Sequence, residues 1–321
     1  MKRIYLSLAF IFGMLQLNAQ QEHHYTQFMY NKLLLNPAYA GARGVPSITG
    51  IYRNQWVGFD GAPKSALISF NSPFLSPRVG VGVTISHESI GLQKDFYGAL
   101  AYSYDLVAGQ KISVRFGIMG SIRSRGRDLT RASADPNQVF DPSIGDLESV
   151  NDITGNVGAG IYASYDNRVY AGFSVPHIYA NTIGINPNAS LIGKEYRHYY
   201  GTVGAILPLS EDINLMPALL VKYVENTPFD ADINLNLDIR KKVTAGISYR
   251  LGGDGPGESV DLLVYWQVTE QLGIGAVYDF SLSKLKDYNA GSIEVLVQAD
   301  LKKQKNNNKK KKSMTNPRFF M

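Results

Sequence analysis

The sequence contains no cysteine among its 321 residues. This absence excludes disulfide bonds, thiolate metal sites and cysteine nucleophiles. Charged residues are also scarce, because only 18% of the chain is Asp, Glu, Lys or Arg, while 45% is apolar. After residue 19 no apolar run reaches the length of about 18 residues that a membrane-spanning helix needs, so the sequence offers no such helix there.

Glycine and aromatic residues are abundant, with 31 Gly, 20 Tyr and 14 Phe. This composition favours closely packed strands over a helix-rich fold. The net charge of +5 comes from the chain ends, because the tail after residue 301 carries seven Lys and Arg318 but no acidic residue. The body between the two ends is net negative, which argues against a nucleic-acid partner.

Residues 1–19 have the features of a signal peptide. Lys2 and Arg3 form a basic start, residues 4–15 form an apolar stretch, and Ala19 occupies a cleavage-like position. We therefore expect an exported protein with Gln20 at its mature N-terminus. A single membrane anchor is the alternative, although the apolar stretch is short for the ~20 residues that cross a bilayer as a helix.

The rest of the chain alternates between apolar and polar residues with the period of two that is typical of strands. In residues 233–239 the odd positions are Ile or Leu and the even positions are Asn or Asp. Fourteen such segments occur, and many are near the roughly 9–11 residues of a tilted transmembrane strand. They cover residues 47–57, 63–72, 78–88, 95–107, 110–124, 154–166, 168–176, 196–208, 211–225, 230–241, 242–252, 258–269, 271–282 and 289–301.

The connections between these segments differ in length in a regular way. Those after even-numbered segments are mostly brief, whereas the two longest, residues 125–153 and 177–195, both follow odd-numbered segments. Outer-membrane barrels have short periplasmic turns and long external loops. The two long connections are therefore expected on the external side.

These features predict an all-β fold, a transmembrane antiparallel β-barrel of about 14 strands of the outer-membrane type. The sheet must close because lipid cannot hydrogen-bond to a sheet edge. Residues 47–301 would form the barrel, residues 20–46 a periplasmic or plug segment, and residues 302–321 a Lys-rich periplasmic tail that ends in NPRFF. We expect the protein in the cell outer membrane with both termini periplasmic. A soluble two-sheet sandwich with the same alternation is the alternative.

Catalytic and cofactor motifs are missing or unconvincing. Residues 158–163 satisfy G-x-G-x-x-A, but they lie within an alternating strand rather than on a strand-to-helix turn. The five histidines lack the spacing of a metal site, and the acids of residues 125–153 do not match the EF-hand pattern. A partner-facing acidic loop is favoured over a calcium site. We expect no enzyme, no cofactor and no metal.

Several motifs point to one family. The sequence reads QFMYN at 27–31, LNPAYAG at 35–41, RNQWVG at 53–58, RHYY at 197–200 and GSIE at 291–294. Together these segments resemble the PorP/SprF family of outer-membrane proteins, which is associated with the Bacteroidetes type IX secretion system.

The resemblance implies an accessory protein of secretion or gliding motility. It implies that the barrel binds and helps to export or anchor a large surface adhesin through the cargo's type B C-terminal domain. Other type IX secretion components on the periplasmic side and outer-membrane lipid are the further expected partners. The candidate partner-binding residues come from these motifs, the acidic loop and the tail: Asn36, Pro37, Tyr39, Gly41, Arg53, Trp56, Asp128, Asp135, Asp141, Asp146, Pro317, Arg318, Phe319 and Phe320.

Two other functions stay open at this point. A passive diffusion channel for small or hydrophobic solutes would use a lumen wide enough to hold water. Its polar lining would include Arg115, Asn236, Asp238, Arg250 and Glu294. A barrel lipid hydrolase would instead need an outward-facing Ser-His pair, and the sequence does not suggest one.

Overall fold

The computed structural model describes residues 25–109, 111–128, 150–184, 192–225, 227, 229–252, 257–282 and 284–301. The predicted signal peptide and the Lys-rich tail lie outside these residues.

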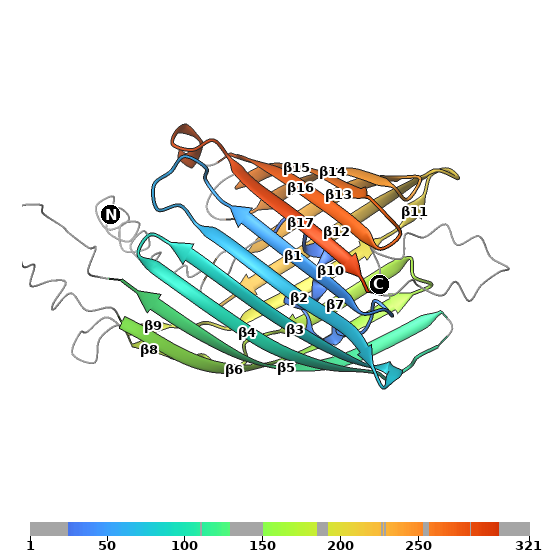
Figure 1. Ribbon diagram of the computed structural model, residues 1–321, viewed down its shortest axis with the longest axis horizontal. Coiled ribbons are helices and arrows are strands. Elements are labelled where there is room, and N and C mark those ends of the chain that lie inside the picture. The colour runs from blue at the N-terminus through green and yellow to red at the C-terminus, as the bar shows by residue number, and fades with distance from the viewer. Residues whose placement is uncertain are drawn as a thin grey trace, which may run out of the picture.

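The wall strands form one closed antiparallel barrel of 14 strands (Figure 1), which confirms the predicted fold class. Neighbours in the chain pair with each other, and β1 pairs with β17 to close the wall. Two of the elements, β10 and β11, are parts of one wall strand, and both pair with β12. The wall elements are β1 (Ser47–Asn54), β2 (Lys64–Phe74), β3 (Ser76–Ile90), β4 (Gln93–Asp105), β5 (Ile112–Arg127), β6 (Val150–Tyr165), β7 (Val169–Val175), β10 (His198–Ala205), β11 (Leu207–Pro208), β12 (Ile213–Val224), β13 (Asp230–Ile239), β14 (Val243–Leu251), β15 (Ser259–Gln267), β16 (Leu272–Ser281) and β17 (Ser292–Asp300).

The remaining described elements are small. A two-stranded hairpin, β8 (Thr182–Gly184) and β9 (Ile192–Lys194), lies in the connection between β7 and β10. The 3-10 segments are η1 (Phe28–Tyr30), η2 (Lys32–Leu34), η3 (Pro37–Tyr39) and η5 (Lys284–Asp287). No helix in the described part of the chain has the length and apolar character to cross a membrane.

The outer face of the barrel is apolar and its inner face is polar, as the alternation predicts. In β13, Ile233 and Leu235 face outward and are 40% and 45% exposed, whereas Asn234 and Asn236 face the lumen and are fully buried, at 0%. A soluble sheet would bury the apolar residues instead. Apolar residues face outward here because hydrocarbon, rather than water, surrounds a transmembrane barrel.

Arginine at Leu235 tests the membrane placement of this wall. Leu235 lies midway along β13, so Leu235→Arg is expected to lower the free energy of unfolding in lipid by about 2–4 kcal/mol. The same substitution at Val243, the first residue of β14, should cost no more than about 1 kcal/mol. Urea titration of the barrel refolded into vesicles measures both values. Equal costs at the two positions would contradict this placement.

The two ends of the barrel differ in their connections. One end, the long-loop end, carries residues 55–63, 128–149 and 176–197, whereas turns such as 166–168 and 240–242 define the short-turn end. The two longest connections thus lie at one end, as the sequence predicts. The first of them is shorter than the predicted 125–153, because β5 and β6 extend into it. The polar strand ends show no apolar alternation and therefore resemble a loop in sequence.

Residues 25–46, here called the plug, run through the lumen from one end of the barrel to the other (Figure 1). At the long-loop end, the backbone N–H of Thr26 donates to Glu294, near the start of β17. At the short-turn end, Arg43 pairs with Asp300, the last residue of β17. The first described residues therefore lie at the opposite end from Leu301. The expectation that both termini are periplasmic concerns chain ends outside the described residues, and it stays a prediction.

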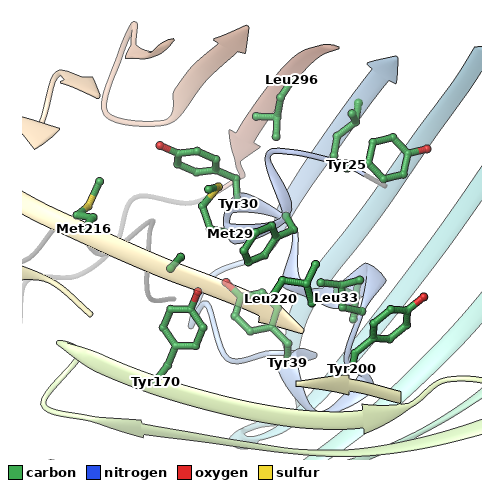
Figure 2. Close-up of a cluster of buried hydrophobic side chains, with 14 of the residues drawn as sticks. Tyr25, Met29, Tyr30, Leu33, Tyr39, Tyr170, Tyr200, Met216, Leu220 and Leu296 are labelled. Carbon is green, nitrogen blue, oxygen red and sulfur yellow. The ribbon is translucent and has the colours of Figure 1, made fainter. Parts of the chain in front are cut away.

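Apolar side chains of the plug form the buried core together with the barrel wall (Figure 2). Tyr30 stacks on Tyr265 of β15, with ring centroids 4.3 Å apart and an interplanar angle of 9°. Met29 and Leu33 are buried beside wall residues such as Leu220. The barrel therefore has an internal core, which the plug supplies in the middle of an otherwise polar lumen.

Candidate functional site

A carboxylate holds the plug at the long-loop end. Glu294 accepts hydrogen bonds from the backbone N–H groups of Thr26 and Gln27, each at 3.0 Å. Arg53 pairs with the same carboxylate at 3.3 Å and with Asp279 at 2.7 Å. All five residues are buried, so each charge depends on these partners for its stabilisation.

The ionic contacts continue around the inner wall. Arg250 of β14 pairs with Asp232 of β13 at 2.7 Å, and Lys222 of β12 pairs with Asp232 at 2.8 Å. The Thr26 hydroxyl donates to Asp261 of β15 at 2.9 Å. This network joins the plug to several wall strands and fixes where it enters the lumen.

Further along the chain, the LNPAYAG motif packs on glycines of the wall. The Asn36 side chain accepts from the Ala38 N–H at 2.9 Å, which caps η3, and donates to the Ile161 carbonyl at 2.9 Å. A Cβ atom on Gly160 would lie 2.2 Å from Asn36 Oδ1, and one on Gly117 would lie 2.3 Å from the Ala38 nitrogen. Glycine at these two positions leaves room for the Asn36 side chain beside Gly160 and for the plug backbone beside Gly117.

The predicted partner-binding residues that belong to the motifs lie inside the barrel, with one exception described below. Asn36, Pro37, Tyr39, Gly41 and Arg53 are all buried against the protein's own barrel and offer no surface to another chain. Their sequence pattern is explained by the seating of the plug. The motif gave no means of distinguishing an internal partner from an external one.

The other predicted partner-binding residues are placed differently. Trp56 is half-buried at the long-loop end, where its backbone N–H donates to Ser292 Oγ at 3.2 Å. Asp128 is half-buried directly after β5. Partner binding by these two residues stays a prediction. Outside the described residues lie Asp135, Asp141, Asp146, Pro317, Arg318, Phe319 and Phe320.

The polar residues proposed for a channel lining all face the lumen, but they are not open to solvent. Arg115, Asn236, Asp238, Arg250 and Glu294 are each at most 4% exposed. The plug fills the lumen beside them. Passage of a solute through the described part of the barrel would therefore require the plug to move.

A cavity of about 290 Å³ lies beside the plug at the long-loop end. Strands β2, β3, β4 and β5 form one side of it, and the connection between β7 and β10 forms the other. The plug residues Tyr25, Leu34 and Leu35 also line it. This cavity is the candidate binding site, because it joins charged, aromatic and apolar groups on a rigid frame.

An ion pair crosses the cavity and ties the β7–β10 connection to the wall. Arg125 of β5 pairs with Glu195 at 2.8 Å and approaches Asp95 of β4 at 3.9 Å. Burial by itself would raise the pKa of the Glu195 carboxyl, but a hydrogen bond from Asn181 and the charges of Arg125 and His177 hold it below its ordinary value. Glu195 is therefore ionised at neutral pH and keeps this connection in place.

Aromatic rings form a row along the same cavity. Tyr97 and His177 meet edge to face at 6.0 Å, and the His177 and His198 rings lie 6.3 Å apart. The His198 ring in turn lies 6.2 Å from Tyr200. In the sequence these histidines lack the spacing of a shared site, because their contacts join residues on different elements. The one available signal was the spacing of Arg123, Arg125 and Arg127 by two along a strand.

The described residues contain no group of three or more His, Cys, Asp or Glu side chains arranged to hold a metal ion. The cavity residues can pair with charges, donate and accept hydrogen bonds, and contact apolar groups. These are the properties of a binding site. That the protein is not an enzyme stays an expectation from the sequence.

A family model described as "Type IX secretion system membrane protein PorP/SprF" matches residues 17–299, which is most of the chain. The chain belongs to the PorP/SprF family. It is thus a membrane protein of the type IX secretion system, and its barrel fits the outer membrane. In this PorP/SprF barrel, the motifs at 27–31 and 35–41 form part of the plug, and the motifs that contain Arg53 and Glu294 hold it.

Solved structures similar to this PorP/SprF barrel are outer-membrane proteins of low sequence identity. A Pseudomonas aeruginosa FadL homologue is 12% identical, with a TM-score of 0.47, and the match covers 86% of this chain and 94% of that one. The Ralstonia pickettii toluene transporter TbuX is 10% identical, with a TM-score of 0.46 and coverage of 86% and 94%. Acinetobacter baumannii Omp33 is 7% identical, with a TM-score of 0.45 and coverage of 80% and 97%. No curated protein matches the chain closely enough for comparison.

Proposed function

We propose that this PorP/SprF protein binds an exported adhesin by its C-terminal domain at the long-loop end of the barrel and helps to export it or anchor it at the cell surface. Its membership of a secretion family supports a role with exported cargo. The observation that carries the proposal is the plug, which packs through the lumen and leaves a cavity beside it at the long-loop end, where a partner can bind.

The orientation of the barrel follows from the same proposal. Long connections of outer-membrane barrels face the outside of the cell and short turns face the periplasm. The long-loop end would then lie at the cell surface, where an adhesin is displayed. The short-turn end, with Leu301, would face the other components of the secretion system.

The described parts of the connection between β7 and β10 are held to each other and to the wall. Arg197 Nε donates to the Ile178 carbonyl at 2.7 Å, and the Ile178 N–H donates to the Val157 carbonyl of β6 at 2.9 Å. Segments that are already held in this way lose little conformational entropy when a partner binds to them. Contact with a partner therefore does not require a rearranged barrel.

Replacement of both long connections tests the function. Exchanging residues 129–149 and 185–191 for short Asn-Gly turns should abolish surface attachment of the adhesin, because it removes the largest connections of the long-loop end. The barrel should still assemble, as shown by heat-modifiable migration in gels. Immunofluorescence of the adhesin on intact cells measures the attachment.

The matched control is an Asn-Gly exchange of residues 209–212, a turn at the short-turn end. This variant should display the adhesin normally. Normal display by the variant without the long connections would refute the proposed binding end.

A further inference from the structure

We infer that the cavity at the long-loop end binds a short, carboxylate-bearing peptide segment of the exported partner, with Arg127 pairing with the carboxylate and His198 accepting a hydrogen bond from a peptide N–H. This inference rests on the proposed function, since it names the part of the partner that enters the barrel. The carboxylate can belong to an Asp or Glu side chain or to the chain terminus.

The size of the cavity limits what can enter. Its volume of about 290 Å³ is near the lower limit of the roughly 300–1,000 Å³ that is common for ligand sites. A folded domain cannot enter such a space, but one or two residues of an extended peptide can. The plug side chains Leu34 and Leu35 offer an apolar surface to the aliphatic part of such a segment.

Arg127 supplies the cation for this site. Arg123, Arg125 and Arg127 alternate along β5, so all three side chains face the lumen and line the cavity. Arg125 is occupied by Glu195 and Asp95. Arg127 makes a hydrogen bond from Nε to Gln93 Oε1 at 3.4 Å and forms no ion pair among the described residues. Its two terminal nitrogens can therefore donate to a carboxylate in the forked geometry that guanidinium groups favour.

His198 supplies the second polar contact. The residue is 6% exposed, and Nε2 has no hydrogen-bond partner within the described part of the chain. Nδ1 lies 3.0 Å from the Tyr196 carbonyl oxygen, which can only accept, so this hydrogen bond places the proton on Nδ1. In the neutral ring Nε2 then becomes an acceptor. A buried acceptor that lines a cavity matches the N–H of a peptide backbone, which an inorganic anion lacks.

The source of the carboxylate is distinguished by three probe peptides and the purified full-length barrel. Acetyl-Gly-Leu-Gln carries only a terminal carboxylate, acetyl-Gly-Leu-Glu-amide carries only a side-chain carboxylate, and acetyl-Gly-Leu-Gln-amide carries neither. At least one of the first two should bind roughly tenfold more tightly than the third in isothermal titration calorimetry. Whichever binds more tightly identifies the source.

Variants connect the binding to the two residues. Arg127→Gln should remove the advantage of the carboxylate peptides, and His198→Phe should weaken all three peptides, because it removes the acceptor and keeps a ring of similar size. Lys64→Gln is the control. It removes a cation from an exposed position at the start of β2, at the long-loop end of the barrel, and should leave the binding of all three peptides unchanged. Equal binding of the three peptides, no binding of any, or a carboxylate preference that survives Arg127→Gln would overturn the inference.

The outcomes distinguish failure of the cavity inference from failure of the proposed function. If the peptides do not bind but removal of the long connections still abolishes adhesin display, the cavity inference falls and the proposed function stands. If the peptides bind as expected but display survives that removal, the cavity is a peptide site and the long connections are not the docking surface.

Discussion

Valine in place of Gly117 is expected to unseat the plug while the barrel wall stays closed. A Cβ atom at this position would lie 2.3 Å from the Ala38 nitrogen and 2.4 Å from its Cα, so backbone rather than a mobile side chain blocks it. Overpacking of this kind costs about 1–3 kcal/mol, and the cost lies toward the upper value where backbone blocks the added atoms. The plug can relieve the clash only by leaving the wall at η3.

Limited digestion with trypsin measures this effect. Lys32 and Arg43 are buried in the plug, so their peptide bonds should be protected in the wild-type barrel and cleaved in Gly117→Val. The same variant should show increased conductance in planar bilayers, which tests whether a diffusion channel lies behind the plug. Gly120→Val is the matched control, because Gly120 lies on the outward face of β5 with open space around it. Equal protease protection in the two variants would contradict the seating of the plug on Gly117.

Removal of the Glu294 carboxylate is expected to lower the stability of the barrel strongly. Glu294→Ala leaves the N–H groups of Thr26 and Gln27 without their acceptor and removes one of the two acidic partners of Arg53. Removal of one partner of a buried ion pair costs about 3–5 kcal/mol of stability, because the other partner remains in the interior as an uncompensated charge. We expect a loss of this size in the free energy of unfolding, measured by urea titration in lipid vesicles.

Glu211→Ala is the control for this measurement. Glu211 is exposed in the turn between β11 and β12, so its removal should change the stability by no more than about 0.5 kcal/mol. An equal decrease in the free energy of unfolding of both variants would contradict the claim that Glu294 holds the plug in place. Partial recovery in Glu294→Gln is expected, since an amide oxygen can still accept one of the backbone hydrogen bonds.

The wall of the barrel was predictable because it depends on local sequence alone. Alternation in a stretch such as residues 233–239 determines which side chains face lipid and which face the lumen, and strand pairing between chain neighbours follows from the short turns. Strand ends were less predictable. Arg125 and Arg127 are part of β5 although their sequence looks like a loop, since the lumen near the strand end accepts polar residues.

The path of the plug and the composition of the cavity were not predictable from local patterns. The contact between Thr26 and Glu294 joins residues 268 positions apart, and that between Arg125 and Glu195 joins residues 70 positions apart. Both depend on which strands face each other across the closed lumen. The resemblance to a family identified the motif residues Asn36 and Arg53, but only their burial shows that they bind the protein's own barrel.

Cysteine labelling on intact cells tests the central claim of a transmembrane barrel with its long-loop end outside. The absence of native cysteine makes single-cysteine variants clean probes. Asp60 is exposed in the connection between β1 and β2 at the long-loop end, and Lys241 is exposed in the turn between β13 and β14 at the short-turn end. A membrane-impermeant maleimide should label Asp60→Cys on intact cells and should label Lys241→Cys only after the outer membrane is permeabilised. Labelling of Lys241→Cys alone on intact cells, or of both variants equally, would contradict the account.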